Sequence, residues 1–237
     1  MYADIMKIFE AGRSLTIEPA AHYFEGGIRV ATDMSTRVPG LFAAGECAGG
    51  LFGANRVSAA TTEMLIEGAQ AGKNAAAYAA DSDLQKPDSA YLDQLGAALV
   101  QPFGLKDGPT PQQLRKQLHE ITGRSLTVIR CEPQLIQALN ELEELEQALQ
   151  TVSLGDSQRV YNQQWRQYLE LRNMLPTARA ITKSAPLRRE SRGVHIRSDY
   201  LITDNDQCLH NIVLSGSQLQ AQRVPVVLTK CKPEAGA

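Results

Sequence analysis

The chain has 237 residues, of which 43% are hydrophobic and 21% charged, so it can bury a core in one large domain or two small ones. Its 24 Lys and Arg residues against 26 Asp and Glu residues give a formal net charge of -2. This balance excludes a broad basic surface that would gather nucleic acid or anionic lipid. Because no apolar run approaches the roughly 18 residues that span a bilayer, we expect no transmembrane segment and a cytoplasmic location.

The four cysteines are far apart in the sequence, and the chain has no C-x-x-C pair, no H-E-x-x-H and no clustered His and Cys residues. This pattern predicts reduced thiols and no metal site. The cysteines are Cys47, Cys131, Cys208 and Cys231.

The first third of the chain is rich in glycine and alanine, and short β-type runs alternate with turns. We expect strands at residues 14–18, 27–31 and 41–44. A helix is expected over residues 61–80, beginning near Ser58, because small and apolar residues recur there at the spacing of a helix packed closely on a sheet. These residues are Met64, Leu65, Ala69, Gly72, Ala75, Ala76 and Ala79.

The second part of the chain is predicted to be helical after a polar linker at residues 81–89. Thr110, Pro111 and Gln113 match an N-cap, an N1 proline and a capping-box partner, and Gly123 is placed to end that helix.

Two further helical patterns follow. Leucines spaced from Leu135 to Leu149 predict an amphipathic helix with a solvated acidic face. Residues 158–173 repeat the pattern, and residues 211–229 are expected to be extended. The apolar stripe of the second pattern, predicted to lie in the core, comprises Tyr161, Trp165, Tyr168 and Leu169.

The first third also contains residues suited to binding a nucleotide cofactor. A predicted strand ends at Glu46, a loop with several glycines follows, and a helix begins near Ser58. Backbone N–H groups and the positive end of a helix would therefore meet at one point and stabilise negative charge there. A carboxylate at a strand end can accept hydrogen bonds from ribose hydroxyls. Taken alone, each glycine more often serves a tight structural turn than a cofactor contact.

Three segments of the chain resemble the carboxyl-terminal segments of the succinate dehydrogenase, fumarate reductase and L-aspartate oxidase flavoprotein family. They are HYFEGGI (22–28), GLFAAGECAGGLFGANR (40–56) and RRESRGVHIRSDY (188–200). Because their order and approximate spacing agree too, the resemblance covers nearly the whole chain. It implies an α+β fold with an incomplete FAD-binding region at residues 1–85 and a helical carboxyl-terminal domain at residues 86–237.

The resemblance also implies FAD as cofactor and hydride transfer between the flavin and a small dicarboxylate. His22 and Arg56 match the family's substrate-binding residues, and the planar fork of arginine suits a carboxylate. Glu46 matches the glutamate that binds FAD, and Thr61 and Thr62 fall where the loop-to-helix junction touches the flavin.

The chain departs from the family pattern in two ways. Phe52 and Ala60 stand where the family commonly has polar residues, which leaves the specificity for a four-carbon dicarboxylate open. In addition, the chain lacks G-x-G-x-x-G and the proton-donor arginine expected in the missing part, so no catalytic residue is assigned. We expect either a fragment of a longer flavoprotein or a split subunit that pairs with an amino-terminal FAD-binding half.

Residues 188–195 form the densest charged cluster, which is expected to be an internal salt-bridge network between the two domains or, alternatively, a docking surface. The resemblance implies an iron–sulfur protein as electron-transfer partner, through which the protein would lie at the inner face of a membrane. Two other functions stay open. One is a non-catalytic assembly module that binds a partner protein without flavin, and the other is part of an L-aspartate oxidase-like flavoprotein.

Overall fold

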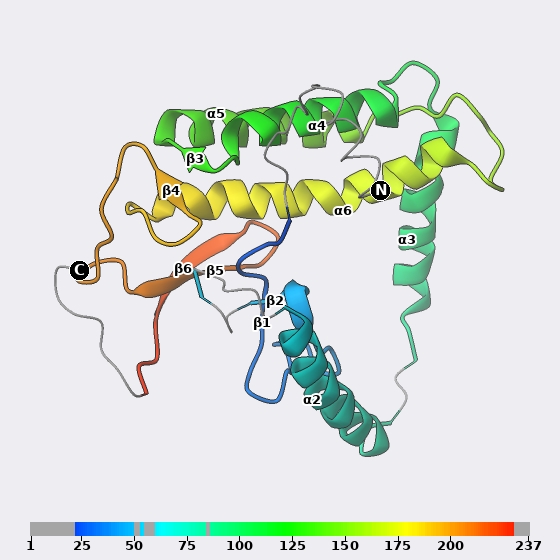
Figure 1. Ribbon diagram of the computed structural model, residues 1–237. Coiled ribbons are helices and arrows are strands. Elements are labelled where there is room, and N and C mark those ends of the chain that lie inside the picture. The colour runs from blue at the N-terminus through cyan, green and yellow to red at the C-terminus, as the bar shows by residue number, and fades with distance from the viewer. Residues whose placement is uncertain (1–21, 50–52, 55–59, 84–85, 230–237) are drawn as a thin grey trace, which may run out of the picture.

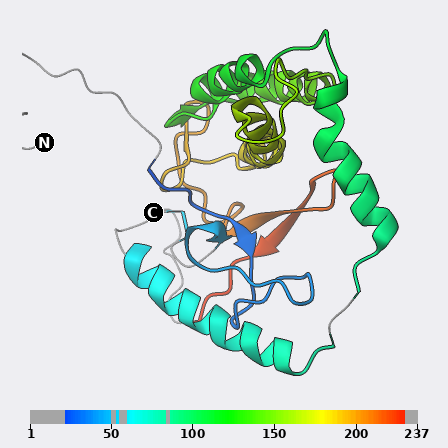
Figure 2. The same cartoon turned by 90° about the vertical axis from the view of Figure 1, so that its right-hand side faces the viewer.

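The computed structural model describes residues 22–49, 53–54, 60–83 and 86–229. A bundle of three helices lies at one end of these residues and the long helix α2 at the other, with short strands and a hairpin between them (Figures 1 and 2). The expected α+β architecture is therefore confirmed. The bundle helices are α4 (Pro111–Ser125), α5 (Glu132–Leu149) and α6 (Gln163–Ser184), and α2 runs over Ala60–Ala80.

The main hydrophobic core lies inside the bundle. Leu142 of α5 and Leu171 of α6 are completely buried, and Leu114 of α4 is 1% exposed. The buried residues recur every three or four positions, so each helix presents one apolar stripe to the other two. Burying one such leucine stabilises the fold by roughly 1.5–3 kcal/mol. The cluster comprises Leu114, Leu118, Ile121, Ala138, Leu142, Leu145, Leu149, Val152, Tyr168, Leu171, Leu175 and Ala178.

The start of α4 confirms the predicted capping box. The backbone N–H of Gln113 donates to Thr110 Oγ1 at 3.3 Å, and the Gln113 side chain accepts from the Thr110 N–H at 2.8 Å. The predicted end is wrong. Gly123 lies inside the helix, which continues to Ser125, where the Leu126 N–H still donates to the Thr122 carbonyl at 2.8 Å.

Helix α6 begins later and ends later than predicted. Asn162 is its N-cap, because its side-chain oxygen accepts from the Trp165 N–H at 2.9 Å. Tyr161 therefore precedes the helix, with a positive φ of 56° and 98% of its surface exposed, so its predicted place in the core is wrong. Tyr168 is buried as predicted, and Trp165 and Leu169 pack partly buried against the core.

Helix α3 (Ser89–Val100) was not predicted from the sequence. Leu92, Leu95 and Leu99 recur there at helical spacing, so the pattern was available in the sequence, although none of the helix's residues is buried. Its start is capped by Asp88, and at its end the Leu99 carbonyl accepts from Trp165 Nε1 at 2.9 Å. In both views α3 runs along one side of the molecule toward the bundle.

The described strands are short and paired two by two. The strands β1 (Ile28–Arg29) and β2 (Ala48–Gly49) are parallel, as are β3 (Ile129–Arg130) and β4 (Ile196–Arg197). The strands β5 (His210–Ser215) and β6 (Gln220–Pro225) form an antiparallel hairpin, which confirms the extended tail.

Two strands predicted in the first third of the chain differ from the structure. The strand expected at residues 27–31 is present only as the two residues of β1. The strand expected at residues 41–44 is wrong, because only an isolated bridge between Phe42 and Ser35 forms there. The strand expected at residues 14–18 lies outside the described residues.

Helix α2 matches the expected range but not the expected buried face. Its buried residues are Glu63, Glu67 and Ala71, which lie four positions apart on one face. Met64 and Leu65, predicted to pack on a sheet, are 51% and 69% exposed. The buried face of the helix thus includes two glutamates, and further along the helix the Tyr78 ring packs edge-on against Phe42, with 6.3 Å between the ring centroids.

Short 3-10 helices are also present among the described residues: η1 (Gly45–Cys47), η2 (Gln101–Gly104) and η3 (Ala185–Leu187). Within the described ranges, Cys47, Cys131 and Cys208 are free thiols, and no helix is long and apolar enough to cross a membrane.

Candidate functional site

The first part of the candidate site is the segment that carries His22. His22 itself is exposed, and the two residues after it are held by acidic side chains. The Tyr23 hydroxyl donates to Glu63 Oε2 at 2.6 Å, and the Phe24 N–H donates to Glu46 Oε1 at 2.9 Å. Glu63 is only 3% exposed, so its bond with Tyr23 is sheltered from water. The imidazole of His22 thus projects from a backbone that is fixed immediately behind it.

Glycine allows this segment to approach the strand β2. A Cβ atom on Gly27 would lie 2.5 Å from the Cys47 carbonyl oxygen, closer than real contacts allow. Directly after it, Ile28 pairs in parallel with Ala48. Glycine at position 27 therefore brings the His22 segment against the strand that follows Glu46.

The second part of the site is the turn that carries Glu46. Gly45 has a φ of +73°, a conformation that glycine adopts without strain, and its N–H donates to Glu67 Oε2 at 2.7 Å. Glu67 is 7% exposed, whereas the side chain of Glu46 beside it is exposed. The turn thus presents a carboxylate outward while its backbone is fixed from behind.

Thr61 and Thr62 lie in the first turn of α2, and both are exposed. Glu46 lies on the turn η1, which is bound to this same helix through Glu67. The structure therefore brings together the Glu46 turn, the His22 segment and the start of α2. Arg56 and Phe52, which the sequence also singled out, lie outside the described residues.

These features fit FAD at this position. An exposed carboxylate oxygen can accept from a ribose or ribityl hydroxyl, and the N-terminal turn of a helix favours negative charge on a bound ring or phosphate. Glu46, Thr61 and Thr62 are the described residues that would hold it.

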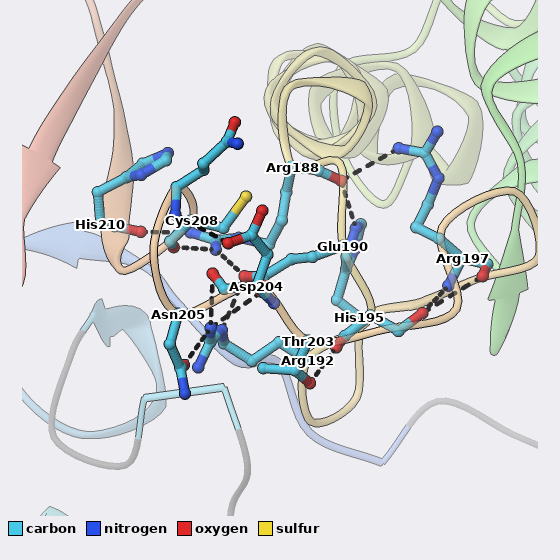
Figure 3. Close-up of polar contacts among 12 residues, drawn as sticks. Arg188, Glu190, Arg192, His195, Arg197, Thr203, Asp204, Asn205, Cys208 and His210 are labelled. Atoms are coloured by element: carbon cyan, nitrogen blue, oxygen red, sulfur yellow. Dashed lines mark hydrogen bonds and ion pairs between the residues drawn. The ribbon is translucent and has the colours of Figure 1, made fainter. Parts of the chain in front are cut away.

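The charged segment at residues 188–210 folds into a buried network (Figure 3). At its centre the Glu190 carboxylate is fully buried and accepts from Arg188 Nη1 at 2.5 Å, from Arg192 Nε at 2.7 Å and from the Asp204 N–H at 2.8 Å. Burial by itself raises the pKa of the Glu190 carboxyl. The hydrogen bonds from Arg192, Asp204 and Arg188 outweigh burial, so the pKa lies below its ordinary value.

Arg197 and His195 extend the network toward the bundle. Arg197 is fully buried and forms a bidentate salt bridge with Asp199, in which both N–O distances are 2.7 Å. His195 lies between Arg130 Nη1 at 3.2 Å and the Arg188 carbonyl at 3.3 Å. Burial, followed by the neighbouring arginine charges, lowers the pKa of His195 to about 4, so the ring is neutral at physiological pH.

One backbone hydrogen bond links this network to the first part of the chain. The Val194 N–H donates to the Ala54 carbonyl at 3.0 Å. Val194 lies in a tight turn that two backbone hydrogen bonds between Arg192 and His195 close. The described ion pairs of residues 188–197 all join residues within 132–199, so the network is internal to the carboxyl-terminal part, and the contact with Ala54 is a backbone bond. A salt-bridge link between the two expected domains stays a prediction.

Three contributing residues were missed from the sequence: Tyr23, Glu63 and Glu67. The available signal was the pair of acids four positions apart at the start of an otherwise apolar helix, where a solvated face would normally be expected.

Comparison with known proteins identifies the family. Residues 115–236, just over half of the chain, match the family described as fumarate reductase flavoprotein C-term. The chain belongs to this family. Residues 5–62 match the FAD binding domain, which agrees with FAD as the cofactor expected from the sequence.

Individual relatives agree with this membership. A fumarate reductase flavoprotein subunit of Mycobacterium tuberculosis is 33% identical over 233 residues, covering 92% of this chain and 39% of that protein. An uncharacterized FAD-dependent oxidoreductase of Methanocaldococcus jannaschii is 31% identical over 211 residues, covering 89% of this chain and 38% of that protein. The chain therefore spans less than two-fifths of the length of these relatives.

Solved structures show the same fold. Sdh1 of Mycobacterium smegmatis in complex with UQ1 aligns with a TM-score of 0.81 at 31% identity, over 87% of this chain and 36% of that one. A quinol-fumarate reductase with menaquinol molecules aligns with a TM-score of 0.82 at 27% identity, over 90% and 39%.

Proposed function

We propose that the chain is the carboxyl-terminal part of an FAD-dependent oxidoreductase that transfers a hydride between the flavin and a small dicarboxylate. The observation that carries the proposal is the convergence on one face of α2. Glu63 holds the segment of His22, and Glu67 holds the turn of Glu46. The side chains that we propose to bind substrate and cofactor thus belong to two segments that are held by the same helix.

When bound, FAD would supply hydride exchange at its N5 atom. The exposed imidazole of His22 would bind one substrate carboxylate, and Arg56 would bind a carboxylate through two parallel N–H groups. Glu46 would accept hydrogen bonds from a hydroxyl of the cofactor, with Thr61 and Thr62 beside the ring. The proton donor is expected outside this chain.

The remainder of the FAD-binding domain would cover the outer face of α2. Met64, Leu65 and Ile66 are 51%, 69% and 65% exposed and adjoin the helix face that holds the site. Contiguous exposed apolar residues of this kind are typical of a surface that another domain or chain covers. We propose that residues 1–85 join this remainder, within a longer polypeptide or in a partner, and that residues 86–237 form the helical domain.

An iron–sulfur protein is the proposed electron-transfer partner, and through it the enzyme would lie at the inner face of a membrane. This part of the proposal rests on the resemblance of the three motifs to the family. It is tested by identifying, through mass spectrometry, the proteins that purify with the chain.

The visible absorption spectrum of the chain, purified in its native complex, tests the proposal. A flavin spectrum, together with a polypeptide that carries G-x-G-x-x-G, is the expected result. A colourless complex without such a polypeptide would contradict it and favour the non-catalytic assembly module. A flavoprotein that oxidises L-aspartate and does not reduce fumarate would favour the aspartate oxidase branch.

A further inference from the structure

We propose that Glu63 and Glu67 are positioning residues that set the spacing between the substrate-binding and flavin-binding segments. The inference rests on the proposed function and deepens it. Neither carboxylate is assigned to substrate or cofactor. Glu63 would act through the side-chain hydroxyl of Tyr23 and Glu67 through the backbone N–H of Gly45, and in each case the adjacent residue does the binding.

Burial makes these two glutamates unusual on α2. They are 3% and 7% exposed, whereas the apolar side chains of Met64, Leu65 and Ile66 beside them are more than half exposed. Burying a carboxylate costs free energy unless hydrogen bonds to it compensate. Both carboxylates have such a bond, and in each case the donor belongs to a site segment and not to the helix.

The geometry gives each glutamate a different segment. The Tyr23 hydroxyl, 2.6 Å from Glu63 Oε2, belongs to the residue directly after His22. The Gly45 N–H, 2.7 Å from Glu67 Oε2, belongs to the residue directly before Glu46. Because Glu63 and Glu67 are one helical turn apart, the rise of about 1.5 Å per residue sets the offset between the two segments.

A second set of contacts joins the same two segments directly. The Phe24 N–H donates to Glu46 Oε1 at 2.9 Å, and Gly27 lies against the Cys47 carbonyl. The two segments and the helix thus form a closed set of contacts. Loosening one bond to α2 would shift His22 relative to Glu46 without removing either side chain.

The test uses the complete flavoprotein with its FAD, and fumarate as the substrate probe. Tyr23→Phe removes one hydroxyl and keeps the ring. We expect it to raise the KM for fumarate about tenfold while kcat changes less, the effect of losing one charge-assisted hydrogen bond. Glu63→Ala should raise KM by a similar factor, and the double variant should show no further rise because both changes break the same bond. Glu63→Gln, which keeps an acceptor oxygen, should recover most of the loss.

A second experiment measures FAD binding and tests the bond between Glu67 and the Glu46 turn. Glu67→Ala should weaken FAD binding about tenfold, and Glu67→Gln should recover it, since the Gly45 N–H needs only an acceptor. Tyr91→Phe on α3, where the ring is 61% exposed, is the matched control and should change neither quantity. If Glu63→Ala does not fold, Tyr23→Phe still decides the result.

The outcomes separate this inference from the proposed function. If His22→Ala raises the KM for fumarate but Tyr23→Phe lowers only the melting temperature and leaves KM unchanged, the positioning role is wrong and the proposed function stands. If His22→Ala leaves KM unchanged as well, the substrate assignment fails, and the positioning role fails with it.

Discussion

The backbone N–H of Val194 donates a hydrogen bond to the carbonyl oxygen of Ala54 at 3.0 Å, and this bond joins the charged segment of the helical part to the loop that precedes Arg56 in the sequence. Val194 lies at the tip of the turn in which Arg192 and His195 exchange two backbone hydrogen bonds. Glu190 fixes the base of this turn through Arg188 and Arg192. The buried network thus contacts Ala54, two positions before Arg56 in the sequence.

Glu190→Gln should destabilise the protein strongly. The change leaves Arg188 and Arg192, whose side chains are 17% and 23% exposed, without their shared counter-charge. Breaking a buried ion pair typically costs 3–5 kcal/mol, and we expect about 3 kcal/mol because the arginines keep some contact with water. Urea unfolding measures the loss, and amide hydrogen exchange at Val194 should become faster.

Glu143→Gln on the exposed side of α5 is the matched control for this charge removal. It should shift the free energy of unfolding by less than about 0.5 kcal/mol. Equal effects of the two variants would show that the Glu190 network does not stabilise the fold.

His195 should make stability depend on pH between its unfolded and folded pKa values. Burial lowers its pKa from 6.5 to about 4, so as the pH falls through this window the unfolded chain takes up a proton that the folded chain does not. The free energy of unfolding therefore falls as the pH falls from 6.5 toward 4.

His195→Gln keeps a polar side chain that cannot titrate, so it serves as the reference. The urea midpoint of the original protein should fall relative to that of the variant over the same window, while contributions from the other histidines cancel. Parallel midpoints at all pH values in the window would contradict the low pKa of His195.

Gly27→Ala should disturb the candidate site locally. The new Cβ would lie 2.5 Å from the Cys47 carbonyl oxygen, so the backbone must shift and the parallel pairing of Ile28 with Ala48 weakens. We expect a loss of roughly 1–3 kcal/mol, as for other overpacked sites, and weaker retention of FAD. Both are measured on the complete flavoprotein, by urea unfolding and by the flavin absorbance that remains after dialysis.

Gly68→Ala supplies the contrast, because a Cβ there meets nothing within 4 Å and the residue lies inside α2. It should stabilise the helix by about 0.5–1 kcal/mol. If Gly27→Ala behaves in the same way, the close approach of the two segments is not needed.

Leu142→Ala should destabilise the bundle by about 3 kcal/mol, since the side chain is fully buried at the centre of the core and its removal leaves a cavity. Ile136→Ala on the same helix, where the side chain is 50% exposed, should cost about 1 kcal/mol or less. Similar costs for the two variants would be inconsistent with the packing of α5.

The helical part followed from the sequence where local signals and packing agree. Thr110, Pro111 and Gln113 fix the start of α4 through local hydrogen bonds, and the leucines of α5 repeat at helical spacing. The prediction that α4 ends at Gly123 was wrong because the hydrogen bond from the Leu126 N–H to the Thr122 carbonyl continues the helix. A glycine allows a helix to end but does not force it to. The prediction that Tyr161 lies in the core was wrong because the N-cap Asn162 sets the start of α6. The spacing of apolar residues does not show where a helix begins.

The motifs of the candidate site could be found in the sequence, but the hydrogen bonds between them could not. His22 and Glu46 could be selected from their sequence neighbours, whereas the bonds from Tyr23 to Glu63 and from Gly45 to Glu67 join residues 40 and 22 positions apart. The buried face of α2 was missed for a related reason. The apolar side chains of Leu65 and Ile66 are 69% and 65% exposed, whereas two carboxylates that would ordinarily be solvated are buried.

The most direct test of the central claim is the flavin absorbance of the complete protein, reduced under anaerobic conditions and then mixed with fumarate. The account predicts that the oxidised flavin spectrum returns with one equivalent of fumarate, and that the His22→Ala variant needs a much higher fumarate concentration to reach the same rate. A flavin that stays reduced in the presence of fumarate, or a complete protein that contains no flavin, would contradict the account.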